Sequence, residues 1–332
     1  MISSSSAKKL FAVLNICLLG GMAAFAQKQN VYYLKNNGKQ VSTRDSADFI
    51  RIISEPDSGS VLYNLKEFYV SGKPKLISTT VNVEPIMLQG QCVRFFPSGK
   101  RQEFANYKRG AKSGEVFEYY PNGKLYEVRQ YDDNKKGKYQ GVDGEYTITT
   151  CNDSTGKALV VDGNGYYLSF DADFKYIFEE GNLKAGLRDG DWKGQQVYKK
   201  REFTFTEKYD NGKLLNGQTV DSTGNTINYT QREIQPEYSG GEQAFGHFLA
   251  HNIRYPKYAK EHNIQGRVYI TFVVESDGAL TDIKAVRSPG GGLTEESVRV
   301  LQMSPKWIPG KQFGRPVRVQ FTVPINFSLG GL

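Results

Sequence analysis

The chain has 332 residues, and 43 Lys and Arg against 35 Asp and Glu give it a formal net charge of +8. Its 39% hydrophobic residues exclude a disordered chain, and no long apolar run recurs after the N-terminal segment, which excludes a multi-span membrane protein. The 21 Tyr and 19 Phe far outnumber the 4 Met, and 35 Gly punctuate them. This composition predicts a mostly β protein of about two domains.

Residues 1–26 have the pattern of an export signal. Lys8 and Lys9 precede the apolar residues 10–19, and Ala24-Phe25-Ala26 forms a small-x-small peptidase site. Cleavage after this site predicts a periplasmic protein. The alternative is an uncleaved inner-membrane anchor that faces the periplasm, because the apolar stretch is close to the lower limit of about 17 residues for crossing a bilayer.

The charge distribution bears on the class of partner, and the cysteine content bears on disulfide formation. Basic residues are interspersed with acidic ones rather than gathered in a stripe, so nucleic-acid binding is not expected. Two cysteines follow the export signal, Cys92 and Cys151. In an oxidising compartment they are candidates for a disulfide, but two lone cysteines do not establish that they are neighbours.

A short aromatic-turn motif repeats through the middle of the chain. Residues 95–100 (Phe-Phe-Pro-Ser-Gly-Lys) recur as residues 119–124 (Tyr-Tyr-Pro-Asn-Gly-Lys), and looser copies lie at 69–73 and 209–213. The glycine supplies the positive φ of a tight hairpin turn, and each hairpin needs a neighbour to bury its apolar face. We therefore expect an antiparallel repeat-hairpin sheet over residues 27–230.

The repeats resemble the MORN-like repeats of bacterial envelope proteins. This resemblance covers roughly residues 65–230, and it implies a scaffold or a binding surface. The aromatic rows favour core packing over a sugar- or lipid-binding platform.

After a linker at 231–239, the pattern changes to that of a small α+β domain at 240–328. Strict alternation predicts strands in which one face is covered and the other is solvated, and helical spacing predicts two covering helices with a short helical turn. The expected elements are helix 242–250, turn 257–262, strand 267–274, strand 280–286, helix 294–303 and strand 317–327.

This C-terminal region is similar to the TonB C-terminal domain. The motifs that support the resemblance are Tyr255-Pro256, Asp277-Gly278, Trp307-x-Pro309-Gly310 and the alternating strand from Pro316 to Phe327. The resemblance implies a two-helix, three-strand periplasmic module of an energy transducer, which grips TonB-dependent outer-membrane transporters. The transporter offers an extended peptide segment that adds as a strand to the sheet edge.

The resemblance also implies the site residues. The docking edge is the last strand, and a second contact lies just before the Tyr-Pro pair. Proline at Val319 is predicted to abolish peptide binding, whereas His247→Ala leaves it intact. The implied residues are Val317, Arg318, Val319, Gln320, Phe321 and Thr322 at the edge, and Asn252, Ile253 and Arg254 at the second contact.

The chain departs from the family pattern in two ways. Family transducers keep an N-terminal helix that meets proton-driven motor proteins of the inner membrane, and a Pro-rich spacer follows it. Here the N-terminal segment is predicted to be cleaved, and the 12 prolines are scattered. A passive periplasmic scaffold that binds protein, glycan or lipid is therefore the second hypothesis, and homodimerisation is left open.

An enzyme is not expected. His247 and His251 have the i, i+4 spacing of metal ligands, but no glutamate lies between them as in zinc proteases of the HEXXH type. Nucleophile-elbow, P-loop and dinucleotide motifs are absent from the sequence. We expect no catalytic residues, metal or cofactor.

Overall fold

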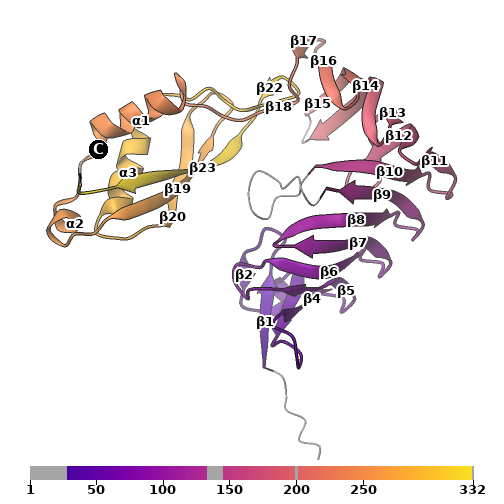
Figure 1. Cartoon of the computed structure of the whole chain (residues 1–332), viewed down its shortest axis with the longest axis horizontal. Helices are drawn as coiled ribbons and strands as arrows, with labels where there is room; N and C mark the ends of the chain where they lie inside the picture. Colours follow the sequence, from indigo (N-terminus) through magenta and orange to yellow (C-terminus); the bar gives the residue numbers. More distant parts are fainter. Residues whose placement is uncertain (1–27, 133–144, 199–200, 331–332) are drawn as a thin grey trace, which may run out of the picture.

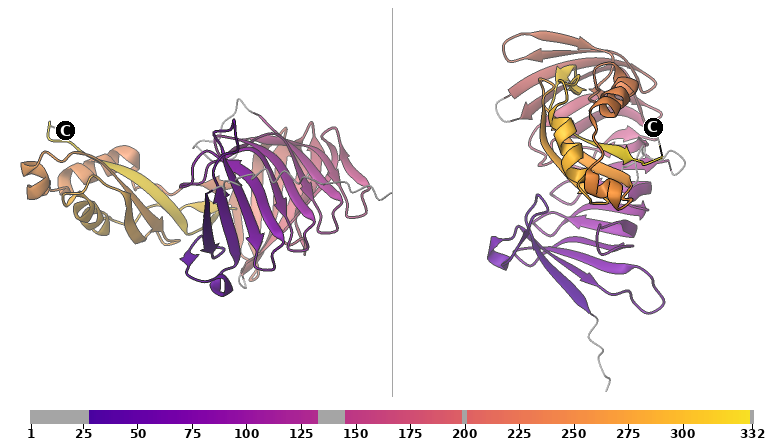
Figure 2. Two further views of the ribbon diagram at one scale, coloured as in Figure 1. Left: turned by 90° about the horizontal axis from the view of Figure 1, so that it is seen from below. Right: turned by 90° about the vertical axis from the view of Figure 1, so that its left-hand side faces the viewer.

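The computed structural model describes residues 28–132, 145–198 and 201–330, so the predicted export signal lies outside the described residues. The molecule consists of a long twisted sheet with a smaller α+β domain beside its C-terminal end (Figures 1 and 2). In the described part of the chain, no helix is long and apolar enough to span a bilayer.

In the described part of the chain, seventeen strands form the long sheet. β1 pairs with β2 and β3, and from β3 onward each strand pairs antiparallel with the next, as far as β17. The strands are β1 (Gln29–Leu34), β2 (Gln40–Val41), β3 (Phe49–Ser54), β4 (Tyr63–Tyr69), β5 (Pro74–Thr80), β6 (Leu88–Phe95), β7 (Arg101–Lys108), β8 (Ala111–Tyr119), β9 (Leu125–Tyr131), β10 (Tyr146–Asn152), β11 (Ala158–Val161), β12 (Asn164–Phe170), β13 (Ile177–Lys184), β14 (Leu187–Tyr198), β15 (Arg201–Asp210), β16 (Lys213–Asp221) and β17 (Thr226–Tyr229). The expected antiparallel meander is confirmed, and the MORN-like label stays a prediction.

The repeated turns bind one another through their lysines. Gly99 and Gly123 have φ of 91° and 89°, which is the left-handed geometry that the turn requires. The Nζ of Lys73 donates to the carbonyl of Ser98 at 3.0 Å, and the Nζ of Lys100 donates to that of Asn122 at 2.9 Å. Each Gly-Lys pair therefore closes its own hairpin and clasps the next one.

Aromatic rings packed against glycines account for the composition of the sheet. Trp192 lies across Gly181, Phe205 across Gly194 and Tyr229 across Gly217, each pair directly opposite on neighbouring strands. The ring occupies the space that a Cβ would need, so it covers backbone that glycine leaves bare.

Buried ion pairs complete the inner face of the sheet. Glu67 is 4% exposed and bonds to Arg51 at 2.6 Å and to Lys75 at 2.9 Å. Four further buried glutamates repeat this arrangement, each with an Arg or Lys partner: Glu103, Glu127, Glu179 and Glu207. Because these carboxylates are paired, their burial is tolerated in the interior.

Cys92 and Cys151 do not form a disulfide. Cys92 on β6 and Cys151 on β10 are both free and fully buried. They lie four strands apart, which corresponds to about 19 Å at the usual strand spacing. A disulfide requires Cα atoms within about 7 Å, so the two thiols belong to separate parts of the core.

The C-terminal domain packs helices on one face of a three-stranded sheet with the order β20-β19-β23. Phe245, Leu301 and Trp307 pack against Ile270 and Phe272 in its core. This agrees with the expected α+β fold, and a small second sheet joins the domain to the preceding chain. The elements are β18 (Glu233–Ile234), α1 (Gly241–Asn252), α2 (Lys257–Glu261), β19 (Gly266–Val274), β20 (Leu280–Arg287), α3 (Leu293–Gln302), β21 (Lys311–Gln312), β22 (Arg315–Pro316) and β23 (Val319–Phe327).

Candidate partner-binding edge

The last strand, β23, lies at an edge of the three-stranded sheet. It pairs with β19 without a bulge, from Val274 opposite Val319 to Gly266 opposite Phe327. In the described part of the chain β23 has β19 as its strand neighbour on one side and none on the other. Of the predicted docking residues, Val319 to Thr322 form the first half of this strand, and Val317 and Arg318 lead into it.

Successive residues of a strand direct their N–H and C=O groups to opposite sides, so the pairing of β19 shows which backbone groups of β23 point away from the sheet. The Glu275 amide donates to the carbonyl of Ala279, and the Glu275 carbonyl accepts from Gly278, so Glu275 is turned toward the β19–β20 hairpin. Val274 is then turned toward β23, and its partner Val319 is turned back toward β19.

The outward backbone groups therefore belong to the even-numbered residues of β23. Pro324 agrees with this assignment, because a proline is tolerated in an edge strand where its nitrogen faces away from the neighbour. Gln320 and Thr322 present both an N–H and a C=O outward, whereas Pro324 presents a C=O. A proline at Val319 would thus disrupt the β19–β23 ladder, and Thr322 is the sharper position for testing the edge.

The side chains of the edge alternate between apolar and polar. Val319 and Phe321 are half-buried on the helix-covered face, where the Phe321 ring lies 5.8 Å from that of Trp307. Gln320 and Thr322 are exposed on the opposite face, and the hydroxyl of Thr322 lies 3.0 Å from that of Thr271. An added strand would meet an apolar flank on one side and an uncharged polar flank on the other.

Ion pairs of Arg318 hold the segment that precedes β23 against the β19–β20 hairpin. Its guanidinium donates to Glu275 at 2.9 Å and to Asp282 at 2.7 Å. Hydrogen bonds from Thr281 and Arg318 hold the pKa of Glu275 below its usual range. The Val317 amide donates to the carbonyl of Gly310 at 2.9 Å, so the backbone is held before the edge begins.

The opposite edge strand, β20, is less suited to strand addition. Its pairing with β19 shifts register twice, between Tyr269 and Ile270 and between Thr271 and Val273. Asp282 within it has a φ of 52°. Bulges of this kind twist an edge away from further pairing, and β23 is therefore the regular edge of the domain.

The second predicted contact lies near the far end of β23. The Asn252 carbonyl accepts from Arg299 at 2.7 Å, and the Arg254 amide donates to Glu296 at 2.5 Å. Tyr255, the next residue, packs its ring against Phe327 with centroids 5.8 Å apart. Residues 252–254 and 317–322 thus flank opposite ends of the strand, which is about 26 Å long at the usual rise per residue.

His247 and His251, which have the i, i+4 spacing of metal ligands, contact each other within α1. The Nδ1 of His251 lies 2.8 Å from the carbonyl of His247, within the helix, and both side chains are exposed. Across the described residues, no group of three or more His, Cys, Asp or Glu is placed to hold a metal ion.

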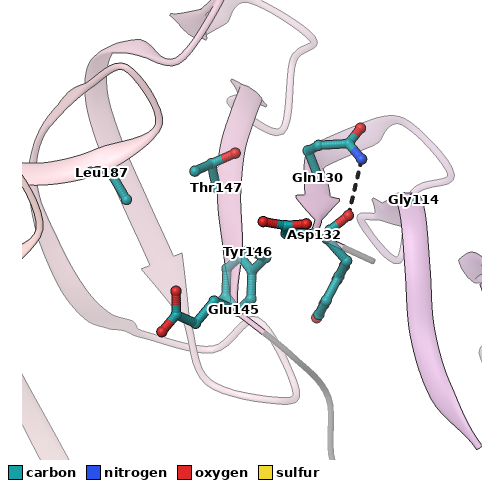
Figure 3. Close-up of a pocket in the computed structure, with 8 residues that line it drawn as sticks. Gly114, Gln130, Asp132, Glu145, Tyr146, Thr147 and Leu187 are labelled. Atoms are coloured by element: carbon teal, nitrogen blue, oxygen red, sulfur yellow. Dashed lines mark hydrogen bonds between the residues drawn. The ribbon is translucent and has the colours of Figure 1, made fainter. Parts of the chain in front are cut away.

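A hollow of about 530 Å³ lies on the long sheet near the β9–β10 connection (Figure 3). Gln130, Asp132, Glu145 and Thr147 line it together with Tyr146, and the Gln130 amide donates to the Tyr131 carbonyl at 3.1 Å. Among the described residues, no histidine lines this hollow, so it does not combine a nucleophile with an imidazole base.

Sequence reasoning missed a hairpin that joins the two parts of the molecule. Phe313 and Gly314, with φ of 51° and 73°, form its tip between β21 and β22. The Phe313-Gly314 pair, flanked by short alternating segments, is the sequence signal that could have indicated this hairpin.

Comparison with known families identifies the C-terminal region. Residues 251–329 match the family described as Gram-negative bacterial TonB protein C-terminal. A search of curated proteins found no match. The matched residues include β19, β20, α3 and the edge strand β23, together with the Tyr-Pro pair. The match therefore assigns residues 251–329 to the TonB C-terminal domain family of the Gram-negative envelope.

Proposed function

We propose that this protein is a periplasmic energy transducer or adaptor that binds TonB-dependent outer-membrane transporters by β-strand addition and so supports transmembrane transport. The observation that carries the proposal is the regular, bulge-free edge of β23. An extended transporter segment would complete the outward hydrogen bonds of Gln320 and Thr322 and then that of the Pro324 carbonyl. Main-chain bonds would supply affinity, and the two flanks would select alternate side chains.

Residues 252–254 would then contact the segment where it leaves the edge near Phe327. Coupling to a proton-driven motor of the inner membrane would require that residues 1–26 remain as an anchor. If they are cleaved, the same edge would serve a periplasmic adaptor. Intact-mass analysis of the protein from separated membrane and soluble envelope fractions distinguishes the two.

A passive scaffold is the second candidate, and hollows on the long sheet favour it. Two hollows of about 440 and 500 Å³ adjoin each other over β15 and β16 and share Thr206 and Asn216. The amide side chains of Gln218 and Asn228 line the larger hollow, whereas charged side chains such as Lys193 also line the smaller one. Hydroxyl and amide groups of this kind suit a neutral glycan, and titration with soluble cell-wall oligosaccharides would test this function.

The edge is tested with Thr322→Pro. The probes are synthetic peptides from the periplasm-facing N-terminal segments of outer-membrane transporters of the same organism, and binding is followed by calorimetry. Loss of one outward amide should weaken binding about fivefold or more, because one net hydrogen bond contributes about 1 kcal/mol. Thr322→Val is the matched control, since it keeps the amide and loses the hydroxyl. Equal binding by the proline variant and this control would refute the proposed edge.

A further inference from the structure

The hairpin that precedes β23 reaches out of the C-terminal domain and into the long sheet. Its strands, β21 and β22, pair with each other, and β21 also pairs with β18. In Figure 1 these short strands lie between the domain and the last strands of the long sheet. The hairpin is part of the domain in sequence, but its tip packs against residues from the repeat region.

The tip residue, Phe313, fills an aromatic socket on the sheet. It is 3% exposed, and its ring centroid lies 4.5 Å from Phe205, 5.6 Å from Phe203 and 6.2 Å from Tyr229. The hydroxyl of Thr219 on β16 donates to the Phe313 carbonyl at 2.9 Å. Aromatic pairs at these distances stabilise a structure beyond the contribution of buried apolar area. The socket therefore favours an aromatic side chain at position 313.

A half-buried arginine, Arg232, covers the socket on the side of the connecting segment. The Arg232 guanidinium lies 4.6 Å from the Phe313 ring centroid and 5.3 Å from that of Phe205. It also pairs with Glu207 at 2.9 Å and with Glu179, both buried in the sheet. The carbonyl of Arg232 accepts the Phe313 amide at 2.7 Å, which ties the covalent connection to the hairpin.

We propose that the hairpin Lys311–Pro316 is a second, noncovalent attachment that locks the C-terminal domain to the repeat sheet, so that the sheet and the partner-binding strand form one rigid body. The chain alone would connect the two parts at a single place, near Thr230, and a single connection permits rotation. The Phe313 socket adds a second point beside the first and removes that freedom.

The lock has a consequence for the edge strand. β22 ends at Pro316 and β23 begins at Val319, so only two residues separate the socketed hairpin from the proposed binding edge. A load applied along β23 would therefore pass into the sheet through the hairpin as well as through the domain core. In this chain the sheet takes the position of a spacer, and it would hold the edge at a fixed place. This inference does not depend on which partner binds the edge.

Distance measurements between two spin labels test the lock. The labels are placed at Ser98→Cys on a sheet turn and Lys260→Cys on α2, both exposed positions, in the full chain with Cys17 replaced by Ser. Cys92 and Cys151 are fully buried and can remain. Double electron–electron resonance should give one narrow distance distribution for this protein. Phe313→Ala should at least double its width.

Phe248→Ala is the matched control, because Phe248 packs in the domain core and not in the socket. It should leave the distribution narrow. A broad distribution in the parent protein, or an unchanged width in folded Phe313→Ala, would overturn the proposal.

A second measurement serves if Phe313→Ala fails to fold. Thr219→Val removes the hydroxyl that donates to Phe313 and preserves the shape of the side chain. Hydrogen exchange at the Phe313 amide should then accelerate about fivefold, the factor expected for loss of one net hydrogen bond. Exchange as slow as in the parent protein would contradict a lock held by the socket. Peptide affinity is measured in parallel, and it reports on the edge rather than on the lock.

Discussion

The two regions of the molecule reach stability in different ways. The long sheet uses local contacts: lysines bind the next turn between β4 and β9, rings lie against glycines in β13–β17, and buried glutamates pair with basic side chains along the sheet. The C-terminal domain instead gathers residues that are far apart in sequence around one core, from Tyr238 to Phe327. A destabilising substitution in the sheet should therefore loosen mainly the repeat that contains it. A destabilising substitution in the domain core should unfold the whole domain.

The two regions also differ in the roles proposed for them. In a repeat array each unit contacts its neighbours, and the array needs a cap at its end. The Phe313 hairpin supplies such contacts at the β15–β17 end of the sheet. The domain supplies a regular edge strand, β23, on which a partner can add. In the proposed function, the sheet holds the domain in position and the domain binds the partner.

The largest expected effect is loss of the domain core through Trp307→Ala. Trp307 is 5% exposed, and its ring lies 5.2 Å from both Phe245 and Phe272. Removing it should lower the free energy of unfolding of the domain by about 3–5 kcal/mol. Limited proteolysis with mass spectrometry should find cleavage within 240–328 and an intact sheet. The neighbouring Ile308→Ala, at a side chain 46% exposed, is the control and should resist cleavage.

A pH effect should appear in the sheet. Glu118 on β8 lies opposite both Glu103 and Glu127, and Arg129 is 3.1 Å from it. Burial raises the pKa of Glu118 to about 7, with Arg129 opposing the shift and Glu127 adding to it. Between about pH 4.5 and 7 the folded sheet then keeps a proton that the unfolded chain has released, so the free energy of unfolding falls as pH rises through this window.

Glu118→Gln should remove this fall. The gain in the free energy of unfolding at pH 8 should be at most about 3 kcal/mol relative to the parent protein, and it should vanish near pH 4. Urea unfolding followed at several pH values measures it. Glu115→Gln, at an exposed position of the same strand, is the control and should show no such pH dependence. A pH-independent difference between Glu118→Gln and the parent would contradict the assignment.

Much of this architecture could be predicted from the sequence because apolar and polar residues alternate along the strands of both regions. The Gly-Lys turns gave the meander, and the alternation from Val268 to Val274 gave the covered face of β19. The edge position of β23 followed from a family resemblance rather than from the residues. The orientation of its amides required the pairing of Val274 with Val319, which are 45 residues apart in the sequence.

What sequence reasoning missed also has a physical cause. Arg232 lies in a segment that was expected to be a linker, yet its guanidinium pairs with glutamates 25 and 53 residues earlier. Phe313 lies at the tip of a short hairpin, whose residue-Gly pair indicates a turn but not the surface against which the tip packs. Contacts between domains leave no local pattern, so the socket could not be predicted from composition or spacing.

A smaller effect is expected from alanine in place of glycine beneath a ring. At Gly194 a Cβ would collide with the Phe205 ring and the Phe178 carbonyl. Gly194→Ala should therefore lower the free energy of unfolding of the sheet by about 2 kcal/mol. At Gly246 in α1 a Cβ would meet nothing within 4 Å, and Gly246→Ala should stabilise the domain by about 0.5–1 kcal/mol. Thermal unfolding of both variants checks the opposite signs, and a shared sign would contradict this contrast.

The smallest effect concerns a single lysine clasp. Lys100→Met keeps the aliphatic stem over Gly123 and removes the ammonium that donates to the Asn122 carbonyl. Loss of one exposed hydrogen bond should lower the free energy of unfolding by about 0.5–1 kcal/mol. Lys100→Arg retains a donor and should recover most of it. Because each clasp joins neighbouring turns, hydrogen exchange should accelerate at the β6–β7 and β8–β9 turns and stay unchanged in the C-terminal domain. Faster exchange spread through the whole sheet would mean that the repeats open together rather than one at a time.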